Sequence, residues 1–200
     1  DTRQEKRRSG PSRRRILNSA AAEVDAIGYR RTTIEGVAKR AGAGKQTIYR
    51  WWKNKAALFL DVYMDLIGYD EAPAGAGSLE EQLTFRLSRV FSVYRQTPAG
   101  RILCGLLSDA QDDEDAADVL TEGLIIGRRH FLVDPVNKAI EAGQVDAAID
   151  VEQFYDTIVA RVWHALLTDP ARLTGAFARS LVSETLIPKL EPPKAIDGST

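Results

Sequence analysis

The chain has 200 residues, of which 44% are apolar and 28% charged, an ordinary composition for a folded globular protein. Its formal charge is only −1, yet the charge is unevenly distributed. Residues 1–55 hold 15 Lys and Arg against 5 Asp and Glu, a formal +10, whereas residues 56–200 hold 12 against 23, a formal −11. A compact basic region suits a polyanion, because each neutralised phosphate releases condensed counterions. We therefore expect contact with nucleic acid through residues 1–55 only.

Cysteine, histidine and long apolar runs are scarce, which argues against several classes of protein. The single Cys104 cannot form an internal disulfide, and two His with one Cys do not supply a structural zinc site unless carboxylates complete it. No uninterrupted run of about 18 apolar residues is present, so neither a membrane-spanning segment nor a secretory signal is expected. These features predict a cytoplasmic protein without a metal or cofactor.

Apolar residues recur at helical spacing along the chain, and no alternating pattern predicts a strand. In the first part, a basic arm at residues 1–12 is predicted to precede helices at residues 13–27, 33–41, 45–52 and 56–67. The second of these helices shows a capping-box pattern, with Thr32 as N-cap and Glu35 three positions later, and it ends at Gly42. Further helices are predicted at residues 79–96, 98–111, 115–142, 151–168 and 171–186, with a break near Asp134-Pro135.

The second and third helices are short and joined by a turn that contains glycine, which is typical of a helix-turn-helix. In that motif the second of the two helices enters the major groove of DNA. At about 100° per residue, Ile48 and Trp52 fall on one side of this helix, toward a core. Gln46, Thr47 and Arg50 fall on the opposite side, and their side chains can hydrogen-bond to base edges.

Aromatic and basic residues flank this outward face. Tyr49 and Trp51 can donate hydrogen bonds to phosphates, and Lys53 and Lys55 add positive charge there. The alternative is that both aromatic residues belong to the core and that Arg50 is a solvated surface charge. Turn length, sidedness and charge agree independently, which favours DNA binding by the segment as a unit.

Two runs of sequence carry a family resemblance: GYRRTTIEGVAKRAG at residues 28–42 and KQTIYRWWKNK at residues 45–55. Together they resemble the DNA-binding domain of the tetracycline-repressor (TetR) family. The resemblance implies a homodimeric transcription regulator, here a repressor that a small hydrophobic effector releases from a pseudo-palindromic operator. By position, it also implies DNA contacts by a set of residues: Thr33, Lys45, Gln46, Thr47, Tyr49, Arg50, Trp51 and Lys55.

Two positions depart from the family pattern. Gly44 stands where Ser or Thr is usual, which removes a side-chain cap at a cost of about a few tenths of a kcal/mol. Trp51 replaces a common His and keeps a ring N–H donor. We therefore predict an all-α protein with a helix-turn-helix domain at residues 1–55 and a larger helical-bundle domain for ligand binding and dimerisation at residues 56–200.

The helix predicted at residues 151–168 carries an apolar band too wide to pack on one side only, and the last helix carries a matching stripe. In the resembled family these two helices build a four-helix bundle across a two-fold axis, so we predict an isologous dimer. The residues assigned to its interface are Tyr155, Val159, Val162, Leu166, Phe177 and Leu181. The alternative is that both stripes form the core of a single chain.

Aromatic and apolar residues of the middle helices are candidate walls of an effector pocket, because such side chains line sites in helix bundles. They are Phe91, Tyr94, Leu103, Cys104, Leu107, Phe131 and Phe154, together with Phe85 and Leu124. For any one of them, a plain core role is more frequent than ligand contact. The polar candidates are Arg128, His130, Arg161 and His164, and His164 is expected to be a core or interface histidine.

The acidic run at residues 112–115 is predicted to stabilise the start of the following helix rather than to hold a metal, because it lacks the alternating ligands and Gly of a calcium loop. The sequence shows no glycine-rich phosphate loop, nucleophile elbow or metal-binding His-Glu-x-x-His pattern, so an enzyme is not expected. Two rival hypotheses remain. One is a helical enzyme or carrier that keeps a DNA-binding domain, and the other is an architectural DNA-binding protein without an effector.

Overall fold

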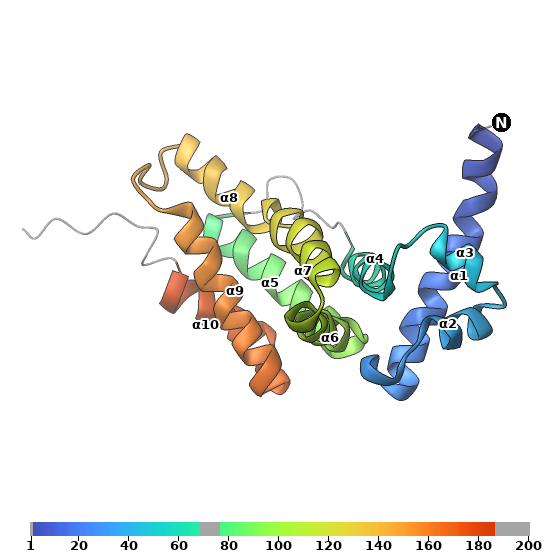
Figure 1. Ribbon diagram of the computed structural model, residues 1–200. Helices are drawn as coiled ribbons and strands as arrows, with labels where there is room; N and C mark the ends of the chain where they lie inside the picture. The colour runs from blue at the N-terminus through green and yellow to red at the C-terminus, as the bar shows by residue number, and fades with distance from the viewer. Residues whose placement is uncertain (1, 69–76, 187–200) are drawn as a thin grey trace, which may run out of the picture. The chain divides into compact units, whose positions relative to one another are not determined.

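The computed structural model describes residues 2–68 and 77–186, and these contain helices and turns but no strand (Figure 1). The α-helices are α1 (Thr2–Ile27), α2 (Ile34–Ala41), α3 (Lys45–Tyr49), α4 (Lys55–Ile67), α5 (Leu79–Gln96), α6 (Ala99–Asp112), α7 (Glu114–Leu120), α8 (His130–Glu141), α9 (Val151–Thr168) and α10 (Gly175–Ser180). Short 3-10 turns are η1 (Tyr29–Arg31) and η3 (Pro170–Arg172), and π-helical turns are η2 (Thr121–Ile126) and η4 (Leu181–Leu186). The all-α prediction is confirmed. None of the described helices is both long and apolar enough to cross a membrane.

The chain divides into two compact units. The first contains Asp1–Tyr69 and Val93–Arg128, and the second contains Asp70–Ser92 and Arg129–Thr200. The first unit thus joins the helix-turn-helix segment, called the head here for residues 12–55, to α4, α6 and α7. The predicted domain boundary after residue 55 stays a prediction.

Apolar residues at helical spacing bury one side of each helix in the head. Ile16, Ala20 and Val24 of α1 are fully buried, as is Val37 of α2. The predicted mobile arm is wrong, because α1 begins at Thr2 and not at residue 13. Residues 4–8 are Gln, Glu, Lys and two Arg, all good helix formers, which explains the longer helix.

In the second unit α9 has the bounds predicted from its apolar spacing, but the predicted break at Asp134-Pro135 is wrong. Pro135 lies inside α8, and the regular helix is interrupted earlier, by turn residues 127–129. Proline has no N–H, so the carbonyl of Phe131 loses its usual helical donor. Arg86 Nη1 of α5 donates to that carbonyl at 3.0 Å, which helps to satisfy it within the continuous helix. The last predicted helix also begins later, at Gly175, after η3.

Candidate DNA interface and family

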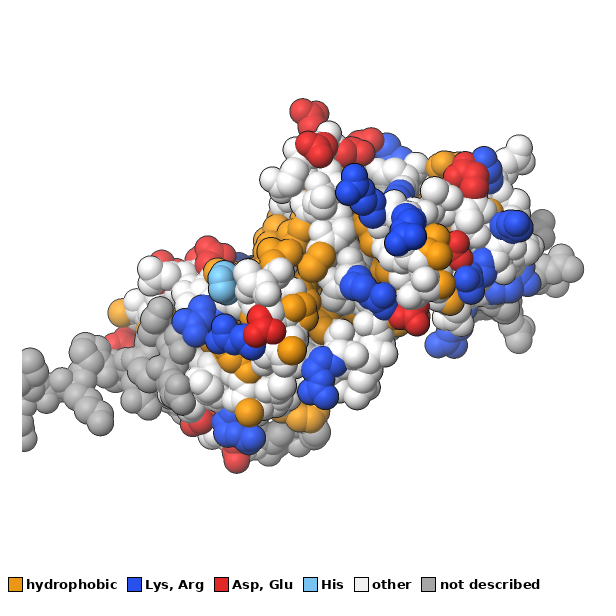
Figure 2. All heavy atoms as spheres, turned by 90° about the horizontal axis from the view of Figure 1, so that it is seen from below, with side chains coloured by type: hydrophobic (Ala, Val, Ile, Leu, Met, Phe, Trp, Pro, Cys, Tyr) orange, Lys and Arg blue, Asp and Glu red, His pale blue; other side chains and the backbone are white. Residues whose placement is uncertain are grey.

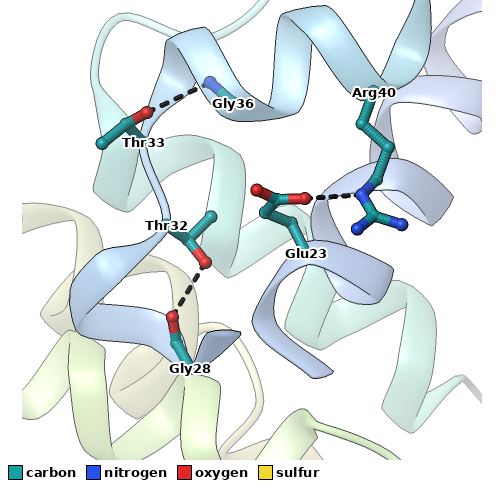
Figure 3. Close-up of polar contacts among 6 residues, drawn as sticks. All are labelled: Glu23, Gly28, Thr32, Thr33, Gly36 and Arg40. Carbon is teal, nitrogen blue, oxygen red and sulfur yellow. Dashed lines mark hydrogen bonds and ion pairs between the residues drawn. The ribbon is translucent and has the colours of Figure 1, made fainter. Parts of the chain in front are cut away.

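The helix-turn-helix begins with a cap that differs from the predicted one (Figure 3). Thr33, and not Thr32, is the N-cap of α2, and its Oγ1 accepts a hydrogen bond from Gly36 N at 3.1 Å. Thr32 is buried and donates its hydroxyl to Gly28 O at 2.9 Å. The predicted capping box is therefore wrong, because the hydroxyl of Thr32 serves the preceding turn. As predicted, α2 ends at Gly42, which has the left-handed φ of 59° that glycine tolerates.

The predicted sidedness of α3 is confirmed. Ile48 is fully buried and Trp52 nearly so, and the indole Nε1 of Trp52 donates to Asp61 Oδ2 of α4 at 2.6 Å. Gln46 and Arg50 are exposed, whereas Thr47 is half-buried. The N-cap Gly44 provides no side-chain hydrogen bond, as its identity predicts. Buried anchors therefore hold a short helix whose polar residues remain within reach of a ligand.

The two flanking aromatic residues differ in exposure. Tyr49 is 52% exposed, which argues against a core role. Trp51 is half-buried and packs edge-on against Trp52, with ring centroids 5.4 Å apart, and the Arg50 guanidinium lies 5.8 Å from the Trp51 ring centroid. These contacts pre-position Arg50 and leave the Tyr49 hydroxyl available to donate.

The lysines assigned to DNA already have partners within the chain. Lys45 pairs with Glu35 at 2.5 Å, and this contact lowers the pKa of Glu35. Lys53 pairs with Asp115 at 2.7 Å, which raises the pKa of Lys53. These pairs are exposed, so DNA phosphates could replace the carboxylates at little cost.

Lys55 is held differently from the other two lysines. Its Nζ donates to Tyr29 O at 3.2 Å and lies 4.1 Å from the Tyr29 ring centroid, and burial lowers its pKa. A lysine ammonium has three donors, so it can contact a phosphate while keeping the bond to Tyr29. Lys55 therefore combines a structural contact in the head with its predicted contact to DNA.

A contact that the sequence analysis missed joins the head to α6. The Tyr29 hydroxyl donates to Asp109 Oδ2 at 2.6 Å, and the ring packs edge-on against Phe59 at 5.0 Å between centroids. Burial, followed by the hydrogen bond to Asp109, raises the pKa of Tyr29 far above its usual range. A Cβ on Gly105 would lie 2.1 Å from the Tyr29 ring, so only glycine permits this approach. We call the contact among Tyr29, Gly105 and Asp109 the head latch.

The end of α4 makes a second set of polar contacts within the first unit. The hydroxyls of Tyr63 and Tyr94 are 2.8 Å apart, and Arg128 Nη1 donates to Gly68 O at 3.0 Å. Burial is the main cause that raises the pKa of Tyr94. Cys104 is half-buried, and burial also raises the pKa of its thiol.

The predicted effector walls fall into both compact units. Tyr94, Leu103, Cys104 and Leu107 lie in the first unit, and Phe91, Phe131 and Phe154 lie in the second. Phe91 and Leu103 are fully buried, and Phe91 stacks on Phe177 with centroids 5.9 Å apart. Of the other candidates, Leu124 is buried, whereas Phe85, His130 and Arg161 are exposed. The assignment of these residues to an effector pocket stays a prediction.

The predicted dimer residues are mostly covered within the single chain. Tyr155, Val162, Leu166 and Leu181 are buried, and Val159 and Phe177 are half-buried. His164 is exposed in the single chain, so it is not a core histidine, and its alternative placement at the dimer interface stays a prediction. The alternative of an intramolecular core therefore accounts for four of the six residues.

The acidic run behaves as predicted at the start of α7. Asp113 is the N-cap, and its Oδ1 accepts from Ala116 N at 3.2 Å. Glu114 and Asp115 lie in the first turn, where negative charge is favoured by the helix dipole. Across the described parts of the chain, no cluster of His, Cys, Asp and Glu has the geometry to hold a metal ion.

Comparison with known proteins places this geometry in a family. Residues 16–62 match the model of bacterial regulatory proteins of the tetR family, and residues 73–185 match the tetracyclin repressor-like C-terminal domain. A DNA-binding transcriptional repressor TetR of Mycobacteroides abscessus is 26% identical over 168 residues, covering 82% of this chain and 86% of the relative.

Solved structures agree with both matches. The crystal structure of the TetR family transcription regulator SCO0332 is 30% identical, with a TM-score of 0.71, and covers 88% of this chain and 97% of that one. The transcriptional regulator FadR from Bacillus subtilis, solved in complex with stearoyl-CoA, shares the fold at 21% identity and a TM-score of 0.67, covering 84% and 97%. The family models together span most of the chain, and the chain belongs to the TetR family of helix-turn-helix transcription regulators.

Proposed function

We propose that this protein is a ligand-responsive repressor that leaves a pseudo-palindromic DNA operator when a small hydrophobic effector binds. The observation that carries the DNA-binding part is the arrangement of α3, where buried Ile48 and Trp52 leave Gln46 and Arg50 exposed. Arg can bond guanine and Gln can bond adenine through paired hydrogen bonds. Because the proposed target is chromosomal DNA, we propose the cytoplasm as its compartment.

Repression as the direction of regulation is supported by similarity. The family model that covers residues 73–185 is described as tetracyclin repressor-like, and the Mycobacteroides abscessus relative is named a repressor.

Response to an effector is supported by the contacts of α4. Tyr94 and Cys104 are candidate effector walls, and Tyr94 also bonds to Tyr63 of α4. A ligand that displaced the Tyr94 hydroxyl would therefore remove a bond that holds α4. The carboxyl end of α4 is further held by Arg128 on Gly68, and its other end leads directly into the head. FadR, a protein of the same fold, was solved with stearoyl-CoA, which makes long-chain acyl compounds the first effectors to test.

Homodimer formation through α9 and α10 rests on the apolar surface that these helices still expose. Val159 and Phe177 are half-buried, and Leu167 is 59% exposed. A Val159→Asp variant should sediment as a monomer if this surface forms the interface, because an unpaired charge would be buried there. Equal dimer mass for this variant and the wild type would remove α9 from the interface.

The central experiment is a selection of binding sites from a random duplex library. Fluorescence anisotropy then measures the affinity for the most enriched duplex. We expect a pseudo-palindrome bound by a dimer, with affinity that falls steeply as salt rises. Failure to enrich any sequence, or equal binding by residues 56–200 alone, would contradict the assignment.

Coupling is then measured with compounds that raise the melting temperature, starting with stearoyl-CoA. Effector affinity with and without operator must change by the same factor as operator affinity with and without effector, corresponding to about 1–3 kcal/mol. A compound that binds but shifts operator affinity less than about twofold is not the inducer. Chemical turnover of the compound would instead favour the rival hypothesis of an enzyme.

A further inference from the structure

The head has a second basic surface that lies outside α3. It is a broad, solvent-open hollow of about 540 Å³ between α1 and α2. Its lining is made of Arg14, Arg15, Asn18, Ser19, Ala22 and Arg40. None of these six residues belongs to the set that the family resemblance assigns to DNA.

The pattern of α1 explains why this surface points outward. Ile16, Leu17 and Ala20 are buried on one side of the helix, so Arg14 and Asn18, one turn apart, fall on the other. The neighbouring Arg13 does not line the hollow and instead forms an ion pair with Asp61 of α4 at 2.5 Å. Arg14 and Arg15 are exposed and form no ion pair with any described residue.

The described lining of the hollow carries a positive charge even when the carboxylate that pairs with Arg40 is counted. Arg14, Arg15 and Arg40 line it, and Arg40 Nε pairs with Glu23 at 2.5 Å (Figure 3). Among the described residues, none that lines the hollow is a carboxylate. Figure 2 shows Lys and Arg side chains gathered over the part of the surface that carries α1–α3.

The chemistry of this lining matches phosphodiester groups. A guanidinium presents a planar fork of donors that fits two phosphate oxygens and never loses its charge near neutral pH. Asn and Ser are further frequent donors to the DNA backbone. A hollow that is open to solvent suits a passing strand better than an enclosed small molecule, because small-molecule pockets bury most of their ligand.

The position of Arg40 connects the hollow to the DNA-reading helix. Arg40 lies in the last turn of α2, two residues before Gly42, where the chain turns toward α3. We infer that this hollow binds the phosphodiester backbone of DNA that flanks the bases read by α3. The inference rests on the proposed function, because it requires α3 to hold the protein on an operator.

The test compares two duplexes that carry the same selected operator. One is trimmed to the operator, and the other is extended by about ten base pairs of mixed sequence on each side, roughly one helical turn. The double variant Arg14→Gln/Arg15→Gln is compared with Arg95→Gln/Lys138→Gln, which removes the same charge from two exposed positions outside the head. Circular dichroism melting of each variant checks the fold.

We expect wild type to bind the extended duplex more tightly than the trimmed one, and the hollow variant to lose this gain, by about tenfold at moderate salt. The slope of log affinity against log salt should fall by about 0.9 for each phosphate that the variant no longer neutralises. Arg14→Lys/Arg15→Lys should keep most of the slope, because it keeps the charge. The control pair should behave as wild type.

Equal losses in the hollow variant and the control pair would mean a general effect of net charge and would overturn the inference. Equal affinity of wild type for both duplexes would overturn it as well, while the operator binding of α3 would stand. If wild type selects no operator at all, the proposed function fails and the inference fails with it.

Discussion

The two sides of the head are held by different kinds of contact. On the α3 side, Gln46 and Arg50 are exposed, and Lys45 pairs with a carboxylate that is itself exposed. Exposed ion pairs of this kind contribute little to stability, because water and salt screen them. On the other side, Tyr29 and Trp52 are buried and bond to carboxylates of α6 and α4. The DNA-reading surface can therefore exchange its own carboxylates for phosphates, while buried contacts set its position.

The largest expected effect separates a buried anchor from an exposed neighbour. Trp52→Ala should lower the free energy of unfolding by about 3–5 kcal/mol, because it opens a cavity and leaves Asp61 without its indole donor. Tyr49→Ala should change stability by less than about 0.5 kcal/mol but weaken DNA binding. Guanidinium unfolding and anisotropy give both quantities. Comparable destabilisation by the two variants would contradict the distinction between the two sides.

Removing one hydroxyl tests the head latch. Tyr29→Phe keeps the ring but loses the bond to Asp109, so we expect a loss of about 1.5–3 kcal/mol, the range for hydrogen bonds to charged groups. The raised pKa of Tyr29 gives this contact a pH dependence. Above about pH 10 this tyrosine ionises in the unfolded chain but not in the folded chain. The contribution of Tyr29 to the free energy of unfolding is therefore fully present below that pH and falls above it.

Denaturant titrations at about pH 8 and about pH 10.5, on either side of the ordinary tyrosine pKa, measure this dependence. Tyr94, whose pKa is also raised by burial, contributes in the same direction, so Tyr29→Phe should reduce the alkaline loss without abolishing it. An identical alkaline loss in the variant and the wild type would show that Tyr29 is not held as described.

Adding one methyl group tests the close approach on α6. Gly105→Ala should destabilise the protein by about 1–3 kcal/mol, because its Cβ would overlap the Tyr29 ring. Without that overlap, the same change inside a helix would stabilise the protein by about 0.5–1 kcal/mol. The sign of the change in the free energy of unfolding therefore shows whether the overlap exists. Gly175→Ala, at the first residue of α10, is a control for a glycine without overlap, since its Cβ would meet Ser88 at an ordinary 3.8 Å.

On the α3 side, variants of the residues that read bases should affect DNA binding differently from a variant of a residue that contacts the DNA backbone. Arg50→Ala and Gln46→Ala should each relax base preference by about 1–3 kcal/mol at one position of the operator, with stability nearly unchanged. Lys55→Ala should weaken binding to all sequences alike, and it should also lower stability through its contact with Tyr29. Sequence selection repeated with each variant checks this, and identical motifs from all three would refute the assignment.

The smallest expected effect concerns an exposed pair. Asp115→Asn frees Lys53 and should leave stability nearly unchanged, while DNA affinity at low salt rises. Raising the salt should erase the gain, because exposed charges are screened within about 8–10 Å. Asp134→Asn, an exposed carboxylate on α8, is the control for net charge. The same gain in the control would show that Lys53 is not the site of competition.

Local patterns in the sequence were sufficient for most of the secondary structure and for part of the interface. The bounds of α5 and α9 and the burial of Ile48 and Trp52 follow from helical periodicity, which depends on neighbours within a few residues. The choice between Thr32 and Thr33 as N-cap could not be made in this way. Both are possible caps, and the choice depends on the turn at Gly28 that accepts the Thr32 hydroxyl.

By itself, the sequence determined the all-α class, the basic head, and the polar side of α3, because composition and helical spacing are local properties. Tertiary structure decided which residues hold that surface in place. Tyr29 and Asp109 are 80 positions apart, and no periodicity links them. Pro135 continues a helix that its ring disfavours, because Arg86 from another helix reaches the freed carbonyl of Phe131. Such contacts depend on how distant segments pack, and a pattern read along the chain does not contain that information.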